Sequence, residues 1–296
     1  MIKNLRKRFI LFNVFVTSVI VVIIGLSVFI GSPRNDLPAH RYVTTLSLAI
    51  VAVYVGSLIL SKAAIRPIQA AWQKQLDFTA DASHELRTPI TIIQTNLDLV
   101  VDSKDETVGS QMKWLKNIEA ENKRMAKLVE DLLTLSRADT DQQMIEKEMF
   151  MFDEAILETL APFEAIASEK NIKLNVTVNN QIAFYGDRKR IKQLAIILLD
   201  NALSYTDSGT VAVDLVRDEK EITITVSDTG HGIEAEHLGK IFDRFYRVSK
   251  TKTLNQDGAG LGLSIAKWIV QEHEGRIQAT STIGVGTSFV VHLPSK

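Results

Sequence analysis

The sequence predicts a membrane-anchored protein of combined α and α/β class, built from three successive parts of a 296-residue chain. Two long runs without charged residues near the N-terminus predict a pair of transmembrane helices. Two later stretches with apolar residues at every third or fourth position predict a helical hairpin. Beyond the hairpin, helical and strand patterns alternate, which is typical of an α/β sandwich. We therefore expect a membrane anchor, a short linker, a hairpin domain and an α/β domain at residues 1–61, 62–75, 76–138 and 144–296.

Composition excludes several classes of function. The net charge is −1, from 34 basic and 35 acidic residues, so no overall positive field recruits nucleic acid. The chain contains 0 cysteines, which excludes disulfides, zinc sites with thiolate ligands and cysteine nucleophiles. The hydrophobic content of 46% is ordinary, but it is concentrated near the N-terminus.

The predicted membrane part consists of residues 9–31 and 42–61, joined by a loop at 32–41 that is too short for a folded domain. Each run can cross a hydrocarbon core of about 30 Å. A signal peptide is the less favoured alternative, because no clear small-x-small cleavage site follows the first run. Basic residues before the first span and after the second place both termini in the cytoplasm. Weakly polar residues in the first span either mark a helix–helix interface or are simply tolerated there, namely Asn13, Thr17 and Ser18.

The two seams of the predicted hairpin are separated by a polar turn at residues 102–109. The first seam contains Leu76, Ala80, Ser83, Leu86, Ile90, Ile93, Leu97 and Val100. The second contains Met112, Leu115, Ile118, Met125, Leu128, Leu132 and Leu135. One hairpin cannot cover its own apolar face, so we expect two copies to pair into a dimeric four-helix bundle. Packing of the hairpin against the C-terminal domain is the alternative.

A histidine beside a carboxylate, His84-Glu85, stands one position off the first seam, where an imidazole can meet both water and a reactant. A neutral imidazole is a nucleophile near physiological pH, and the Glu85 carboxylate is placed to act as its general base. Thr88 lies one helical turn beyond His84 and shares its face. A zinc-protease motif would need a second histidine at that position. Pro89 lacks an amide proton, so we expect the helix to bend or loosen there.

The surrounding segment, from Phe78 to Thr91, resembles the H-box of sensor histidine kinases along its whole length. The resemblance implies that His84 is the phosphoacceptor. It also implies that Thr88 helps to place the water that hydrolyses the phosphorylated response regulator, the partner protein of such kinases.

The C-terminal part follows a polar linker at residues 136–143 and shows mixed patterning. Strict alternation of apolar and polar residues predicts strands, and longer apolar stretches predict helices. We expect strands at 172–178, 211–216, 222–226 and 287–293, and helices at 188–205 and 261–274.

Two polar motifs stand at the ends of these elements. Asn201 ends an apolar helical run and offers an amide oxygen that a magnesium ion accepts, although by itself it fits a helix-terminal cap equally well. The segment Asp228-Thr-Gly230-His-Gly232-Ile233 directly follows a strand. A buried carboxylate there can accept a hydrogen bond from an adenine amino group, while glycines let the backbone approach the base. Many ordinary turns look the same.

Two further motifs follow along the chain. Ile241–Arg247 contains a phenylalanine pair, which is either core or the anchor of a mobile lid, and Arg247 can reach a β- or γ-phosphate. The segment Gly258-Ala-Gly260-Leu-Gly262-Leu263 opens a helix, whose free amides and positive dipole end suit phosphate. A polar stretch from Ser249 to Asp257 precedes it, as a lid would require.

These four segments resemble, in the same order, the ATP-binding motifs of the same kinases, whose domain has the histidine-kinase/Hsp90-like ATPase fold. The resemblance implies Asn201 as the magnesium ligand. It further implies nucleotide contacts from Asn201, Tyr205, Asp228, Gly230, Gly232, Ile233, Arg247, Gly258, Gly260, Leu261, Gly262, Leu263 and Thr287. The chain departs from the family at Ile197, where an asparagine is frequent, and at Ser204, where a lysine or arginine is frequent.

The resemblance therefore implies a homodimeric sensor histidine kinase in a bacterial cell membrane, with ATP and Mg²⁺ as cofactors. His84 would be phosphorylated and would pass the phosphoryl group to an aspartate of a response regulator, and a phosphatase activity is expected as well. The very short extracellular loop suggests sensing in the membrane or through a partner membrane protein or transporter. Two rival functions are an ATPase of the chaperone or topoisomerase type and a nucleotide-binding membrane receptor without kinase activity. Because of the departures at Ile197 and Ser204, the receptor without kinase activity remains an alternative function.

Overall fold

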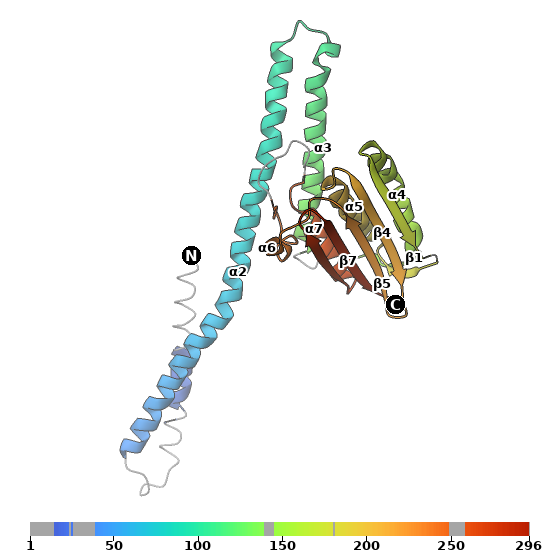
Figure 1. The fold of residues 1–296 in the computed structure, drawn as a ribbon. Helices are drawn as coiled ribbons and strands as arrows, with labels where there is room; N and C mark the ends of the chain where they lie inside the picture. Colours follow the sequence, from blue (N-terminus) through green and yellow to red (C-terminus); the bar gives the residue numbers. More distant parts are fainter. Residues whose placement is uncertain are drawn as a thin grey trace. The chain divides into compact units, whose positions relative to one another are not determined.

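The computed structural model describes residues 15–23, 25, 39–138, 145–179, 181–248 and 258–295 (Figure 1). The chain divides into two compact units, Met1–Ala80 and Asp81–Lys296, and each is treated by itself. The polar stretch from Ser249 to Asp257 that was predicted as a lid lies outside the described residues.

One helix, α2 (Ala39–Asp102), runs through several segments that were predicted to be separate. Residues 62–75, expected to form a linker, lie inside this helix, because the segment is rich in alanine, glutamine and lysine and has no glycine, although it contains Pro67. The helix also continues through Pro89, so the expected interruption is limited to the hydrogen bond that proline cannot donate.

The membrane prediction concerns residues that the structure describes only in part. Within the described part of the chain, no helix meets the length and apolar character that a membrane crossing requires. The first expected span, 9–31, extends beyond the described residues, and residues 42–61 lie inside α2, where the side chains are described only in part, so both spans remain predictions.

The hairpin is closed by α3 (Val108–Ala138), which returns alongside the second half of α2 (Figure 1). At the turn, the side-chain amide of Gln111 donates to the backbone oxygens of Val100 and Ser103, at 3.3 and 2.6 Å, and so satisfies the C-terminal end of α2. Inside the hairpin, Nδ2 of Asn117 donates to Oδ1 of the buried Asn96 over 3.1 Å.

The first seam divides into two faces. Leu86, Ile93 and Val100 are half-buried on the side that also carries the buried Pro89 and Asn96. A second set, separated by multiples of seven residues, stays 44–52% exposed and comprises Leu76, Ile90 and Leu97. Heptad spacing of exposed apolar residues is the pattern of a helix that packs against another helix.

The α/β domain has a five-stranded mixed sheet, and the order of its strands is β2-β4-β5-β7-β6. Their bounds are β2 Ile172–Val178, β4 Gly209–Arg217, β5 Glu221–Asp228, β6 Arg276–Thr282 and β7 Gly286–Pro294. β2 pairs with β4 in parallel, and the other pairs are antiparallel. A separate antiparallel pair consists of β1 (Glu148–Met151) and β3 (Ala183–Gly186).

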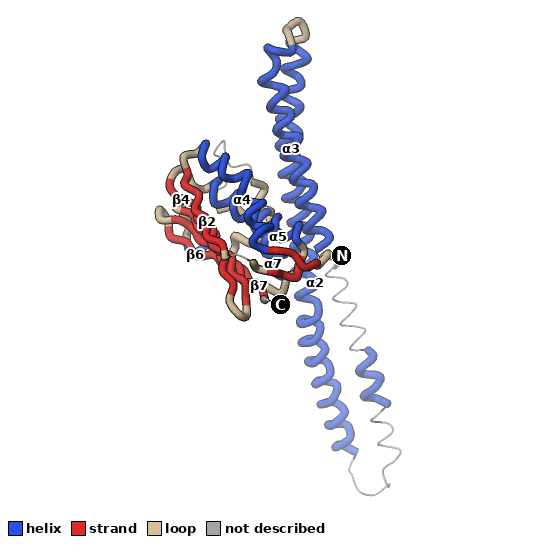
Figure 2. The backbone as a smooth tube through the Cα atoms, turned by 90° about the vertical axis from the view of Figure 1, so that its right-hand side faces the viewer, coloured by secondary structure: helices blue, strands red, loops and turns tan. Residues whose placement is uncertain are grey.

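Three helices cover one face of the sheet, α4 (Phe152–Glu169), α5 (Arg188–Ser204) and α7 (Gly262–Glu272) (Figure 2). Alternate residues of β5 are buried, in line with a sheet whose apolar face points to the helix layer. The predicted α/β sandwich is therefore confirmed, and the six predicted elements are found with small shifts of their ends. The elements α4, β1, β3, β6 and the short α6 (Ala235–Leu238) were not predicted.

The C-terminal end of α3 packs on the α/β domain rather than remaining available to another hairpin. Leu128 and Leu135 are 5% and 1% exposed and belong to the same apolar cluster as the core of α4, α5 and α7. Packing against the C-terminal domain, the alternative to pairing in a dimer, thus applies to this part of the hairpin. At the other end of α3, near the turn of the hairpin, Met112 remains 42% exposed.

Candidate functional site

A cavity of about 1680 Å³ brings the four polar motifs of the α/β domain together. Pockets for small ligands usually measure about 300–1,000 Å³. This cavity is larger because it continues onto the hairpin, where Glu85 and Pro89 of α2 and several residues of α3 line it. All of its lining residues belong to the unit Asp81–Lys296.

Asn201 lies in the last turn of α5 and faces this cavity. Its Nδ2 donates to the backbone oxygen of Ile197 over 2.8 Å, so the side-chain oxygen Oδ1 is the atom left to bind a ligand. The helix ends directly afterwards, where Tyr205 is the C-cap residue and donates its backbone N–H to the oxygen of Asn201 over 3.1 Å. Asn201 is therefore not the helix cap, and its oxygen suits a hard cation such as Mg²⁺.

Asp228 ends β5 and is 9% exposed. Its Oδ1 accepts two backbone hydrogen bonds, from Gly230 at 2.9 Å and from Thr287 at 3.2 Å. Burial raises the pKa of the Asp228 carboxyl, and the two hydrogen bonds partly oppose this shift. Because both bonds end on Oδ1, Oδ2 keeps its capacity to accept from a donor in the cavity.

The turn after Asp228 packs backbone against backbone. A Cβ atom at Gly230 would overlap the backbone oxygen of Tyr205, and one at Gly232 would overlap that of Thr282. Gly232 also has a φ of +74°, in the left-handed region that glycine adopts without strain. The two glycines thus allow the end of α5 and the β6–β7 turn to approach Asp228.

Ser281, which was not predicted, joins the Asp228 turn to β7. Its hydroxyl accepts from the backbone N–H of Ile233 over 2.7 Å and lies 2.9 Å from Oγ1 of Thr287. Ser281 stands on β6, 48 residues from Ile233 along the chain. No local sequence pattern could reveal it, because only the pairing of β6 with β7 brings it to the site.

The phenylalanine segment and the glycine-rich segment meet through their backbones. The N–H of Phe245 donates to the oxygen of Gly260 over 2.9 Å, and both residues are left-handed, with φ values of +59° and +74°. Phe242 contacts Phe289 edge-on at a ring distance of 6.4 Å, and both phenylalanines of the pair are partly buried and pack against the core. Arg247 is half-buried and lines the cavity.

The two departures from the family pattern both lie at the cavity. A Cβ atom at Gly262 would lie 3.3 Å from Cγ2 of Ile197, so the isoleucine packs against the start of α7. Ser204 also lines the cavity. Basic side chains on α5 and α3 contribute to the same lining, namely Lys189, Arg190, Lys192, Lys123, Arg124 and Lys127. Acidic side chains such as Asp131, Asp187 and Asp200 line the same cavity, so the basic groups offer local contacts for a phosphate and not an overall positive field.

The structure brings most of the predicted site residues together. The lining contains Glu85 and all predicted nucleotide residues except Gly230, which acts from behind through the hydrogen bond to Asp228. His84 and Thr88 are not part of the lining, although they flank Glu85 on α2. The His84 side chain is exposed and that of Thr88 is half-buried.

Comparisons with known proteins agree with this division of the chain. Residues 74–141 match the family of the His Kinase A (phospho-acceptor) domain, and residues 186–296 match the family of histidine kinase-, DNA gyrase B- and HSP90-like ATPases. The sensor histidine kinase CusS of Escherichia coli O6:H1 is 34% identical over 247 residues, which cover 83% of this chain and 51% of that protein. The sensor protein SrrB of Staphylococcus aureus is 35% identical over 234 residues, which cover 75% of this chain and 38% of that protein.

Two solved structures are similar to the chain. The histidine kinase AdeS of Acinetobacter baumannii has a TM-score of 0.59 and 28% identity, and the match covers 72% of this chain and 98% of that one. The histidine kinase ThkA, solved in complex with the response regulator protein TrrA, has a TM-score of 0.61 and 25% identity, and the match covers 77% of this chain and 64% of that one. The chain thus spans about half the length, or less, of the CusS and SrrB relatives. Its two matched domains, in this order, identify it as a member of the sensor histidine kinases of two-component systems.

Proposed function

We propose that the chain is an ATP-dependent protein-histidine kinase that phosphorylates itself on His84 and passes the phosphoryl group to an aspartate of a response regulator. The supporting observation is the cavity itself, which contains the nucleotide motifs together with Glu85, the neighbour of His84, and Pro89 of the same helix. An ATPase of the chaperone type would need no histidine segment at its nucleotide site.

The residues of the cavity form two regions, one that suits the adenine of ATP and one that suits its phosphates. Asp228, with Oδ2 available, suits the amino group of the adenine. The basic side chains and Arg247 suit the phosphates. Asn201 would hold a Mg²⁺ ion through Oδ1, and this ion would neutralise phosphate charge.

Phosphoryl transfer needs little covalent work from the nucleotide domain, because positioning and electrostatics supply most of the catalysis. The exposed His84 ring offers one nitrogen as the nucleophile. Glu85, half-buried beside it, accepts the proton from the other nitrogen. Thr88, one turn farther, is assigned to the water that hydrolyses the phosphorylated response regulator.

Dimerisation is part of the same proposal. The exposed heptad positions Leu76, Ile90 and Leu97 give each chain an apolar face that a second copy covers in a four-helix bundle. The ThkA relative was solved with a response regulator protein, which supports a partner of this kind.

The membrane location is likewise proposed from the sequence. Residues 9–33 and 42–61 lack charges, and basic residues flank them, so we place both termini and the kinase domains on the cytoplasmic side of a bacterial cell membrane. With a loop of ten residues between the spans, the stimulus is assigned to the membrane or to a partner membrane protein or transporter. Replacing residues 1–61 by an unrelated transmembrane hairpin tests this assignment, and a retained signal response would contradict it.

Incubation with γ-labelled ATP tests the kinase activity. We expect acid-labile label on the wild type and on His292→Gln, a histidine outside the cavity, and none on His84→Gln. Free phosphate without labelled protein would instead support the ATPase. Neither product, together with retained nucleotide binding, would support the receptor that only binds nucleotide.

A further inference from the structure

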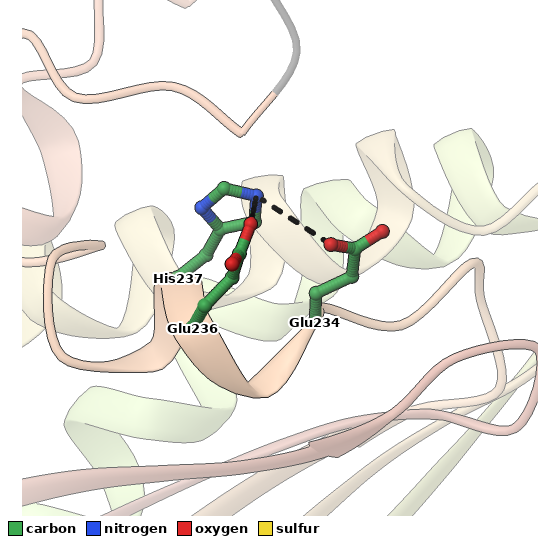
Figure 3. Close-up of side chains that lie close together, drawn as sticks. All are labelled: Glu234, Glu236 and His237. Carbon is green, nitrogen blue, oxygen red and sulfur yellow. Dashed lines mark ion pairs between the residues drawn. The ribbon is translucent and has the colours of Figure 1, made fainter.

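His237, on the short helix α6, makes a side-chain contact with the segment that carries Arg247. Its Nδ1 lies 2.6 Å from the hydroxyl of Tyr246, and the two rings are 6.0 Å apart. On the opposite side of the ring, Nε2 faces Glu236 at 3.6 Å and Glu234 at 3.9 Å (Figure 3).

The two glutamates favour one ring nitrogen of His237 as the carrier of the proton in the neutral form. Carboxylates accept hydrogen bonds and attract an N–H, so they favour the tautomer that is protonated on Nε2. Nδ1 then has a lone pair and accepts the O–H of Tyr246. The three groups also lie close enough to hold a cation, but both carboxylates are exposed, and the contact with Tyr246 needs no ion.

Tyr246 stands between two residues that already belong to the cavity region. On one side, Phe245 is bound through its N–H to the oxygen of Gly260 over 2.9 Å. On the other side, Arg247 lines the cavity, as Tyr246 itself does. The Tyr246 backbone is fixed through its N–H to the oxygen of Asp243, at 3.3 Å. The contact with His237 therefore adds a side-chain restraint directly before Arg247.

We propose that His237 is a positioning residue for the phosphates of the nucleotide, acting through Tyr246 on Arg247. This inference rests on the proposed function, because it needs a nucleotide in the cavity. It predicts a selective effect. Adenine is assigned to Asp228, which lies on β5 and is held by Gly230 and Thr287, whereas His237 acts on the phosphate side only.

Nucleotide binding to the full chain tests the inference with two variants, His237→Ala and Tyr246→Phe. The second removes one hydroxyl and leaves the ring in place, so it separates positioning from folding. We expect each variant to weaken ADP binding by about 3- to 10-fold, the effect of one hydrogen bond. Adenosine binding should stay within about 2-fold of the wild type, because adenosine has no phosphates and the lost hydrogen bond positions only Arg247.

The double variant gives the second readout. If the two side chains act through one contact, His237→Ala combined with Tyr246→Phe weakens ADP binding no more than either change alone. His237→Gln, which keeps an acceptor, should recover part of the affinity. His292→Ala is the matched control, because its side chain is 20% exposed, against 21% for His237, is paired with Glu221, and is not in the lining.

Equal losses for ADP and adenosine, or additive losses in the double variant, would overturn the inference and leave His237 with a structural role. A wild type that binds ADP but does not label His84 would refute the kinase activity and leave the binding test intact. A wild type that binds neither ADP nor adenosine would overturn both proposals.

Discussion

The backbone N–H of Asp187 donates to Nε2 of His273 over 3.0 Å, which joins the residue that precedes α5 to the residue that follows α7. His273 is 3% exposed, and its Nδ1 donates to the oxygen of Ile269 over 2.8 Å. Both ring nitrogens are therefore used, and the proton of the neutral ring is on Nδ1. This contact holds together the two helices that border the nucleotide cavity.

The stability of the α/β domain should depend on pH through this histidine. Burial lowers the pKa of His273 below its usual value of 6.5, so the unfolded state binds the proton more strongly than the folded state. The stabilisation that the neutral His273 ring provides is fully present above about pH 6.5. It is lost as the pH falls from there through the lowered pKa, by up to about 1.4 kcal/mol per pH unit. Urea unfolding of the wild type and of His273→Gln between pH 7.5 and 5.5 measures it. The same pH dependence in both proteins would contradict the prediction.

Replacing Asp228 by asparagine should weaken the binding of both ADP and adenosine by at least about 10-fold, because a donor replaces the acceptor Oδ2. The amide oxygen can still accept from Gly230 and Thr287, so we expect the thermal unfolding temperature to change little. Calorimetric titration with both ligands is the measurement. Retained adenosine affinity would show that Asp228 does not contact the base.

Gly230→Ala should lower the free energy of unfolding by about 1–3 kcal/mol, the usual cost of overpacking. The added Cβ would overlap the backbone oxygen of Tyr205, and backbone cannot rotate away as a side chain can. Gly239→Ala is the matched control, because nothing lies within 4 Å of its Cβ position and its φ is −72°. Equal denaturant midpoints for the two variants would contradict the close packing described for this turn.

Ser204→Lys should strengthen the binding of ADP and ATP several-fold, and Ser204→Glu should weaken it, because Ser204 lines the cavity beside Asn201 and Tyr205. A new cation attracts phosphate, and the gain should shrink as salt rises and screens it. Titrations at low and high salt provide the measurement, with adenosine as the uncharged reference ligand. Lysine and glutamate variants that bind ADP equally well would place Ser204 away from the phosphates.

The sequence allowed the order of domains and most of the site to be predicted, since these depend on local patterns. The strands and helices with regular periodicity were located, and so were α5 and the motifs around Asn201, Asp228 and Gly260. The sequence did not predict that α2 continues through the linker at 62–75, where alanine, glutamine and lysine favour a helix. The helix α4, with Pro162 inside it, and the short strands β1 and β3 gave no clear period.

The sequence by itself determined that a histidine segment and a nucleotide site are present, because each motif lies within about ten neighbouring residues and keeps its own spacing. Only the tertiary structure decided how the motifs are held. Ser281 reaches Ile233 and His273 reaches Asp187 through sheet pairing and helix packing, and His237 reaches Tyr246 across the turns that follow α6. The first two contacts carry no local signal, because the residues that form them acquire their roles only when distant segments fold against one another.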